Sequence, residues 1–132
     1  MIIGASVTTT PYKIRTLRAE HYLRCGADIL LNGIQMDIEG EARCVVCGDV
    51  TSLKMSEGAI RTVDPSTAVL HVVEIPRESG RPSILCEASP LFDKENCLRV
   101  WLESYDGRKG LVLKPQEFLD RMVRMMSNVG PN

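Results

Sequence analysis

The cysteines of this 132-residue chain are the residues whose type and spacing point most directly to chemistry. Cys25 and Asp28 stand three positions apart, so they share one face of a helix or helical turn. The Asp28 carboxylate could accept the proton of the Cys25 thiol there and return it elsewhere. Gly26 and Ala27 leave little bulk around the sulfur. The spacing alone also fits a blander arrangement, a buried cysteine beside a surface aspartate.

A second motif, Cys-x-x-Cys-Gly, consists of Cys44, Cys47 and Gly48. It is typical of a zinc knuckle, in which the glycine permits the turn that aims backbone amides at the sulfurs. A structural zinc site needs four ligands, and no second Cys-x-x-Cys is present. The residues that would have to complete the site are His21, His71, Cys25 or Cys86. A redox dithiol, or two strand cysteines without a metal, are the alternatives.

The remaining cysteines and His71 carry weaker signals. Cys86 belongs to a short apolar run, residues 83–87, which is typical of a core strand. Cys97 stands near Trp101 in a helical pattern, which predicts a packing role. His71 lies in the most apolar run of the chain and is predicted to be a hydrogen-bonded core residue.

Composition and charge exclude several classes of protein. Hydrophobic residues make up 44% and charged residues 25%, as is ordinary for a soluble globular domain. The formal net charge of −1 and the 5% aromatic content argue against a nucleic-acid partner bound by general positive charge or base stacking. We therefore expect no nucleic-acid partner.

Five is an odd number of cysteines, so they cannot all pair with one another within the chain. The amino terminus lacks a basic segment followed by a long apolar run. No apolar run approaches the ~20 residues that a bilayer-spanning helix needs. These observations predict a cytoplasmic protein with no membrane partner, in which the thiols stay reduced.

Hydrophobic periodicity and turn signals predict the elements that position these residues. Residues 1–20 are expected to be an extended lead-in, and residues 21–132 a single α+β domain. Helices are predicted over 19–34, after an N-cap at Asp93, and from Pro115. The predicted strands are residues 42–47 and 50–55, which form a hairpin, and residues 58–63, 68–75, 83–87 and 111–113. Residues 76–82 are predicted to be a polar loop.

The order of these motifs resembles the catalytic core of the organomercurial (alkylmercury) lyase family. Cys25 and Asp28 come first, then Cys44 at the hairpin, and Cys86 on a later strand. The other segments in the matching order are Thr62-Val63-Asp64-Pro65, the run 69–73, Leu91-Phe92, the helix with Trp101, and Gly110–Leu113 before Pro115-Gln116-Glu117-Phe118. The resemblance covers roughly residues 20–126 and implies a small, mostly antiparallel sheet with flanking helices.

In this family the residue matching Cys25 is the first catalytic cysteine, and the residue matching Asp28 is the catalytic acid. The residue matching Cys86 is the second catalytic cysteine, and the one matching Cys44 is structural. The implied activity is protonolysis of carbon–mercury bonds to a hydrocarbon and Hg(II), which serves mercury detoxification. Hg(II) is a soft cation and thiolate is a soft ligand, so the expected mercury ligands, Cys25 and Cys86, suit the chemistry.

The resemblance further implies that no cofactor is required, because mercury is substrate and product. Its implied partners are a small organomercurial, cellular thiols and a mercuric reductase. Family members carry an additional amino-terminal helical domain, and this sequence resembles the core alone. We therefore expect either a homodimer partner or residues 1–20 to cover the site.

Two departures from the family pattern affect the expected chemistry. Cys47 stands where the family has threonine, which creates a possible zinc or mercury site with Cys44. Glu87 and Ala88 replace a Cys-His pair after Cys86. The alternative function is therefore a thiol-rich protein on the same scaffold that binds or transfers zinc, copper or mercury without lyase turnover.

Overall fold

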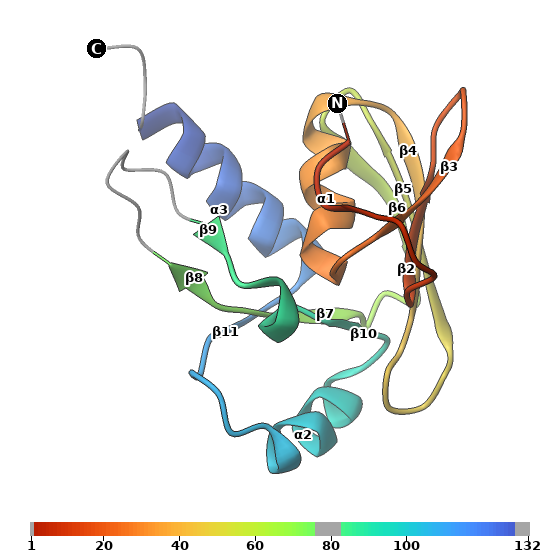
Figure 1. Cartoon of the computed structure of the whole chain (residues 1–132). Coiled ribbons are helices and arrows are strands. Elements are labelled where there is room, and N and C mark those ends of the chain that lie inside the picture. Colours follow the sequence, from red (N-terminus) through yellow and green to blue (C-terminus); the bar gives the residue numbers. More distant parts are fainter. Residues whose placement is uncertain (1, 76–82, 129–132) are drawn as a thin grey trace.

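Antiparallel sheets and three α-helices make up residues 2–75 and 83–128, the part of the chain that this computed structural model describes (Figure 1). The helical elements are α1 (Gly26–Gln35), the 3-10 helix η1 (Cys86–Ala88), α2 (Glu95–Ser104) and α3 (Pro115–Asn128). The strands are β1 (Ala5–Ser6), β2 (Tyr12–Arg15), β3 (Glu20–Leu23), β4 (Ile38–Arg43), β5 (Val50–Ser56), β6 (Ala59–Asp64), β7 (Val69–Val72), β8 (Glu74–Ile75), β9 (Ser83–Ile84), β10 (Leu91–Phe92) and β11 (Leu111–Leu113). The predicted α+β class, with mostly antiparallel sheet and flanking helices, is confirmed.

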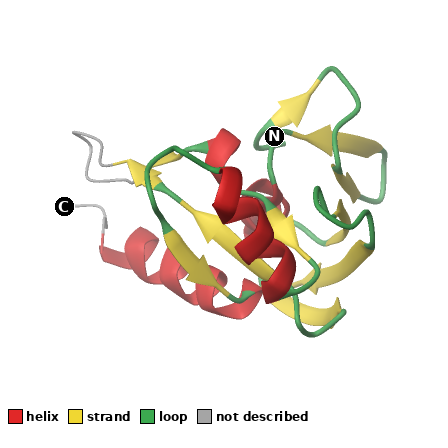
Figure 2. Cartoon of the chain, turned by 90° about the horizontal axis from the view of Figure 1, so that it is seen from below, coloured by secondary structure: helices red, strands yellow, loops and turns green. Residues whose placement is uncertain are grey.

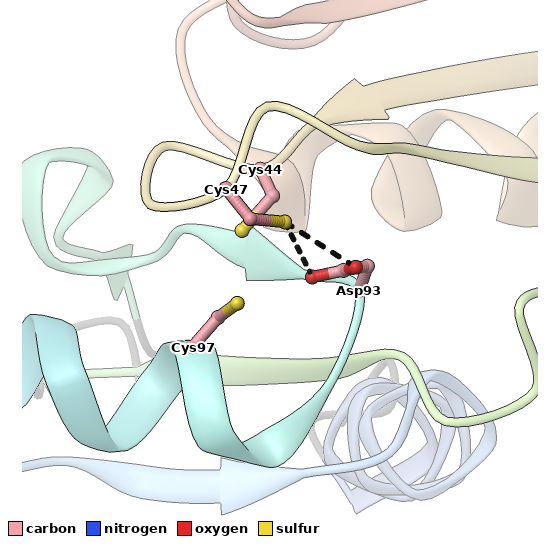
Figure 3. Close-up of side chains that lie close together, drawn as sticks. All are labelled: Cys44, Cys47, Asp93 and Cys97. Atoms are coloured by element: carbon pink, nitrogen blue, oxygen red, sulfur yellow. Dashed lines mark hydrogen bonds between the residues drawn. The ribbon is translucent and has the colours of Figure 1, made fainter.

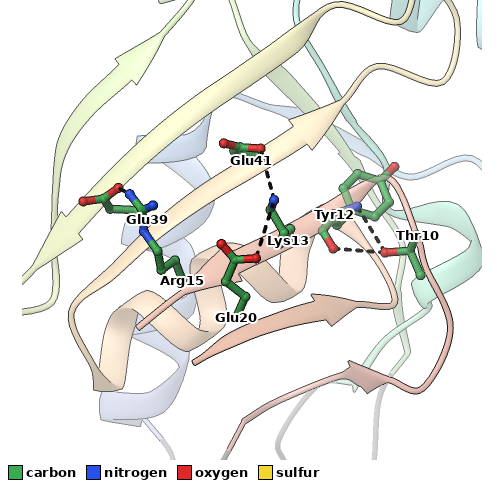
Figure 4. Close-up of polar contacts among 7 residues, drawn as sticks. All are labelled: Thr10, Tyr12, Lys13, Arg15, Glu20, Glu39 and Glu41. Atoms are coloured by element: carbon green, nitrogen blue, oxygen red, sulfur yellow. Dashed lines mark hydrogen bonds and ion pairs between the residues drawn. The ribbon is translucent and has the colours of Figure 1, made fainter. Parts of the chain in front are cut away.

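The largest sheet has six strands in the order β1-β3-β2-β4-β5-β6, all paired antiparallel. Alternate residues of β4 are buried, so one face of the sheet packs on the core and the other meets solvent. On the solvent face, Lys13 contacts Glu20 and Glu41, and Arg15 contacts Glu39 (Figure 4). Exposed ion pairs each contribute only about 0–1 kcal/mol, so the stability of the sheet comes mainly from its buried face.

Helix α1 lies between the large sheet and the elements that follow it in the chain (Figure 1, Figure 2). It contacts β2, β3, β4, β5 and β6 on one side and β7 and α3 on the other. Seven of its ten residues are buried, among them Asp28 and Asn32. Because α1 is enclosed in this way, the side chains of its first turn are held in place by packing on several sides.

A smaller sheet, in the order β10-β7-β11, forms the second half of the fold. All four residues of β7 are buried, as predicted for the most apolar run. Helices α2 and α3 both contact this strand. His71 in β7 is 2% exposed and hydrogen bonded through both ring nitrogens, which confirms its predicted place in the core.

The first helix begins later than predicted. Residues 20–23 form β3, which pairs with β1 and β2, and the helix starts at Gly26 after an extended Cys25. The periodic spacing of Leu23, Ala27 and Leu30 suggested one helix. All three are buried, but Leu23 belongs to β3 and the other two belong to α1. Tertiary strand pairing therefore overrides the helical pattern in residues 20–23.

Four further local predictions differ from the structure. The strand predicted over 42–47 is β4 at Ile38–Arg43, and residues 44–47 lie between β4 and β5. The strand predicted over 83–87 ends at Ile84, and Cys86 begins the 3-10 helix η1 instead. The N-cap of α2 is Lys94, and the Asp93 carboxylate accepts hydrogen bonds from the Cys47 thiol. The run 68–75 is divided between β7 and β8.

The expected lead-in, residues 1–20, contributes strands to the large sheet. Strand β1 pairs with β3, and β2 lies between β3 and β4. The predicted polar loop at residues 76–82 lies outside the described residues. Within the described residues, no helix has the length and apolar character needed to cross a membrane.

We predict that Gly26→Ala lowers the free energy of unfolding by about 1–3 kcal/mol, the usual cost of overpacking. A Cβ at this position would lie 2.6 Å from Leu91 Cβ and 2.7 Å from the Leu91 nitrogen, so backbone would have to move. Urea denaturation measures the change. Glu103→Ala, an exposed substitution in α2, is the control. Equal stability of the two variants would contradict this account of the contact.

Candidate active site

Three predicted site residues that are far apart in the sequence lie together in the structure. The Sγ atoms of Cys25 and Cys86 and a carboxylate oxygen of Asp28 all lie within 4.8 Å of one another. Cys86 Sγ is 3.9 Å from Asp28 Oδ2. Cys25 is the N-cap of α1, Asp28 lies in its first turn, and Cys86 is the first residue of η1. Both catalytic cysteines expected from the sequence thus face the expected acid.

A close backbone contact brings the two cysteines together. The Gly26 amide donates a hydrogen bond to the Ser89 carbonyl oxygen at 3.1 Å, and Leu91 packs directly on the glycine Cα. Glycine is needed because any side chain would collide with Leu91. The chain segment that carries Cys86 is therefore held against the start of α1, next to Cys25.

Hydrogen bonds from the small sheet and within the segment fix η1. His71 Nε2 accepts the Gly110 amide at 3.0 Å, so Nδ1 carries the proton and donates it to the Ala88 carbonyl oxygen at 2.7 Å. The buried Ser89 hydroxyl donates to the Leu85 carbonyl oxygen at 2.8 Å. His71 is thus a positioning residue for the turn that holds Cys86.

The amino-terminal segment lies over Asp28. Gly4 has a φ of +71°, and a Cβ there would lie 1.9 Å from Asp28 Oδ2. The Asn32 side chain holds this segment through hydrogen bonds with both the amide and the carbonyl of Ile3, at 2.8 and 2.9 Å. Ile3 and Gly4 therefore lie on one side of the carboxyl group.

The two thiols differ in burial and in proton affinity. Cys25 is 1% exposed, whereas Cys86 is partly exposed. The adjacent Cys86 raises the pKa of Cys25 well above its usual range, and burial and Asp28 act in the same direction. The Cys25 thiol, in turn, lowers the pKa of Cys86, against the opposing effects of burial and Asp28. Deprotonation is therefore easier at Cys86 than at Cys25.

The Asp28 carboxyl is 4% exposed, and burial raises its pKa. The Cys25 side chain and Arg24 partly offset this effect. A carboxyl group with a raised pKa holds a proton more readily at neutral pH, as a general acid must. The site thus combines a thiol that loses its proton more readily, a thiol that holds its proton more tightly and a buried carboxyl between them.

A second group of potential ligands lies at the turn between β4 and β5. Sulfur atoms of Cys44, Cys47 and Cys97 and an oxygen of Asp93 lie within 4.8 Å of one another (Figure 3). The prediction that His21, His71, Cys25 or Cys86 would complete a site with Cys44 and Cys47 was wrong, because none of them belongs to this group. The group is completed instead by Asp93, which was predicted to be a helix N-cap, and by Cys97, which was predicted to pack in the core. Their i, i+4 spacing at a helix start was the missed signal.

We predict that Cys86 alkylation by iodoacetamide reaches half its maximal rate below the pH of an ordinary thiol, about 8.5. Cys25→Ala removes the neighbour that stabilises the Cys86 thiolate, so this pH moves upward. Peptide mass spectrometry follows Cys86 over a pH series, with a free cysteine peptide as the reference. An unchanged pH dependence in Cys25→Ala would contradict the proton sharing between the two thiols.

Comparisons with known proteins identify the family of the chain. The alkylmercury lyases of Bacillus cereus and Clostridium butyricum are each 25% identical to the chain over 123 residues. Each alignment covers 92% of this chain and 56% of the relative, so the chain spans little more than half their length. A crystal structure of the mercury-bound form of MerB2 shares the fold, with a TM-score of 0.72 at 17% identity, over 97% of this chain and 63% of that one. The family model described as alkylmercury lyase matches residues 5–126, and the chain therefore belongs to the alkylmercury lyase family.

Proposed function

We propose that this protein cleaves carbon–mercury bonds of organomercurials by protonolysis, releasing a hydrocarbon and Hg(II). The observation that carries the proposal is the convergence of two thiols and one buried carboxyl within 4.8 Å. Two sulfurs satisfy a soft, two-coordinate Hg(II) ion, and the carboxyl supplies the proton. The family membership supports the same reaction.

Cys86 binds the substrate first in this mechanism, because its thiolate is the more accessible and the more easily formed. Its sulfur attacks the mercury of an organomercurial–thiol adduct, forms an Hg–S bond, and releases the small thiolate. The cellular thiols expected as partners thus deliver the substrate. This exchange follows the usual dependence of thiol reactivity on the thiolate form.

Cys25 then transfers its proton to Asp28 and binds the mercury as a second thiolate. The three-coordinate mercury carries more electron density on its carbon, which makes that carbon basic. Protonated Asp28 delivers the proton to the carbon, the Hg–C bond breaks, and the hydrocarbon leaves. The proton of Cys25 has become the proton of the product, and Asp28 is again ionised. Hg(II) remains bound by Cys25 and Cys86 until external thiols exchange with it.

We predict that Asp28→Asn lowers the rate of benzene release from phenylmercury by roughly 10²–10⁴-fold, the usual contribution of a general acid. Asparagine cannot relay the proton, although both sulfurs remain. Gas chromatography with excess small thiol measures the rate. Asp106→Asn, an exposed substitution of the same kind, is the control. Full turnover by Asp28→Asn would contradict the role of the carboxyl.

A reaction in deuterium oxide follows the proton itself. Because the transferred proton comes from exchangeable thiol and carboxyl groups, we predict that each benzene molecule gains one deuterium. Mass spectrometry of the released gas measures this label. Unlabelled benzene would exclude protonolysis by Cys25 and Asp28.

The alternative function, binding or transfer of a soft metal without turnover, has a distinct outcome. It predicts that phenylmercury binds to the protein and keeps its phenyl group, even with excess thiol. The group of Cys44, Cys47, Asp93 and Cys97 is the observation that favours it. Absence of benzene with retained organomercury would replace the lyase proposal with this alternative.

A further inference from the structure

The ligand group at the β4–β5 turn is separate from the proposed catalytic residues and has no role in their chemistry. It joins three thiols and one carboxylate from two distant segments, residues 44–47 and 93–97. Cys47 Sγ donates to both Asp93 oxygens, at 3.3 and 3.4 Å (Figure 3). The side chains of Cys44 and Cys97 point toward the same space (Figure 3).

We propose that Cys44, Cys47, Asp93 and Cys97 form a tetrahedral structural site for Zn²⁺. This site links the turn between β4 and β5 to the start of α2. It is independent of the proposed lyase activity, since none of its ligands takes part in that reaction.

The donor set fits zinc better than other common ions. Zinc binds cysteine sulfur at about 2.3 Å and carboxylate oxygen at about 2.0–2.2 Å, so neighbouring sulfurs of a tetrahedron lie about 3.8 Å apart. The four ligand atoms, all within 4.8 Å of one another, reach this geometry through small side-chain movements. Calcium and magnesium require oxygen ligands and do not suit three thiols. Four protein ligands also close the site, as in structural zinc centres.

The backbone around the first two ligands forms a hydrogen-bonded turn. The Gly48 amide donates to the Cys44 carbonyl oxygen at 2.9 Å, and the Cys44 amide donates to the Asp49 carbonyl oxygen at 2.9 Å. Gly48 adopts a φ of +82°, a left-handed conformation that favours glycine. The turn therefore holds the two sulfurs on one side without needing the ion to form it.

The other two ligands are equally well positioned. The Thr67 hydroxyl donates to the Asp93 carbonyl oxygen at 2.7 Å, and Cys97 is fixed in the first turn of α2. Cys44, Asp93 and Cys97 are only 3%, 5% and 3% exposed, whereas Cys47 is exposed and leaves a path for the ion.

The charges around the site also favour a cation. Three thiolates and one carboxylate carry a formal charge of −4, which Zn²⁺ reduces to −2. The Lys94 ammonium, 3.9 Å from Asp93 Oδ2, offsets part of the remainder. Holding these four groups together without a cation would be costly once the thiols ionise, because three of the four are buried.

The position of the site gives the ion a structural effect. It would cross-link residues 44 and 47 to residues 93 and 97, in addition to the contacts between β4 and β10. The segment that starts at Cys86 runs through β10 and ends at Asp93. Bound zinc would therefore anchor the far end of the segment whose near end carries Cys86.

Elemental analysis of the full chain, purified under reducing conditions from zinc-supplemented cells, tests the proposal. We expect one zinc ion per chain. Replacing it with Co²⁺ should give the ligand-field and thiolate-to-cobalt absorption bands of a tetrahedral sulfur site. Chelation of the zinc should lower the Tm. Zinc-free protein with fully reduced thiols and no cobalt bands would overturn the proposal.

Variants distinguish this site from the other thiols. Cys47→Ser changes an exposed ligand, so the variant should fold. It should lower the zinc affinity at least about 100-fold, which exceeds the roughly 10–100-fold effect of losing an outer-shell partner. Asp93→Asn removes the proposed carboxylate ligand and should also lower the zinc affinity. Val45→Ser, an exposed substitution in the same turn, should keep the zinc.

The double variant Cys25→Ser/Cys86→Ser should also keep its zinc while losing any lyase activity. Zinc that persists in Cys47→Ser but disappears from the double variant would place the ion at the other thiols and contradict this site. A Cys44–Cys47 disulfide in protein purified with reductant, found by mass spectrometry, would show a redox dithiol instead.

Discussion

The close packing of Leu91 on Gly26 is the constraint on which the candidate site depends. It brings the segment from Cys86 to Leu91 against the first turn of α1, where Cys25 and Asp28 lie. Hydrogen bonds from His71 and Ser89 then fix the turn at Cys86. The enclosed helix α1 and the glycine at its first position thus determine the distance between the two thiols. The proposed chemistry requires this distance to be short.

That short distance also determines how protons are distributed. The neighbouring Cys86 raises the pKa of the Cys25 thiol, whereas Cys25 lowers the pKa of the Cys86 thiol. Burial raises the pKa of Asp28 in α1, against whose carboxyl group Gly4 lies. The packing that brings the residues together therefore also gives them different proton affinities.

Local sequence patterns predicted the α+β class, most strands and the face shared by Cys25 and Asp28. They failed where distant segments decide the structure. Strand pairing, which has no local signal, makes residues 20–23 a strand. The hydrogen bond from the distant His71 to Ala88 helps to hold η1 where a strand was predicted. The roles of Asp93 and Cys97 were missed because their partners lie some fifty residues away in the sequence, at Cys44 and Cys47. The order of motifs linked Cys86 to Cys25 through a family resemblance, which spacing alone could not do.

The central claim is that Cys25 and Cys86 hold the mercury after its carbon bond has broken. A crystal structure of the protein after reaction with one equivalent of phenylmercury tests this most directly. We expect a mercury atom bound by both sulfurs, next to Asp28, with no phenyl group attached. Mercury that keeps its phenyl group on a single thiol, or that lies among Cys44, Cys47 and Cys97, would contradict it.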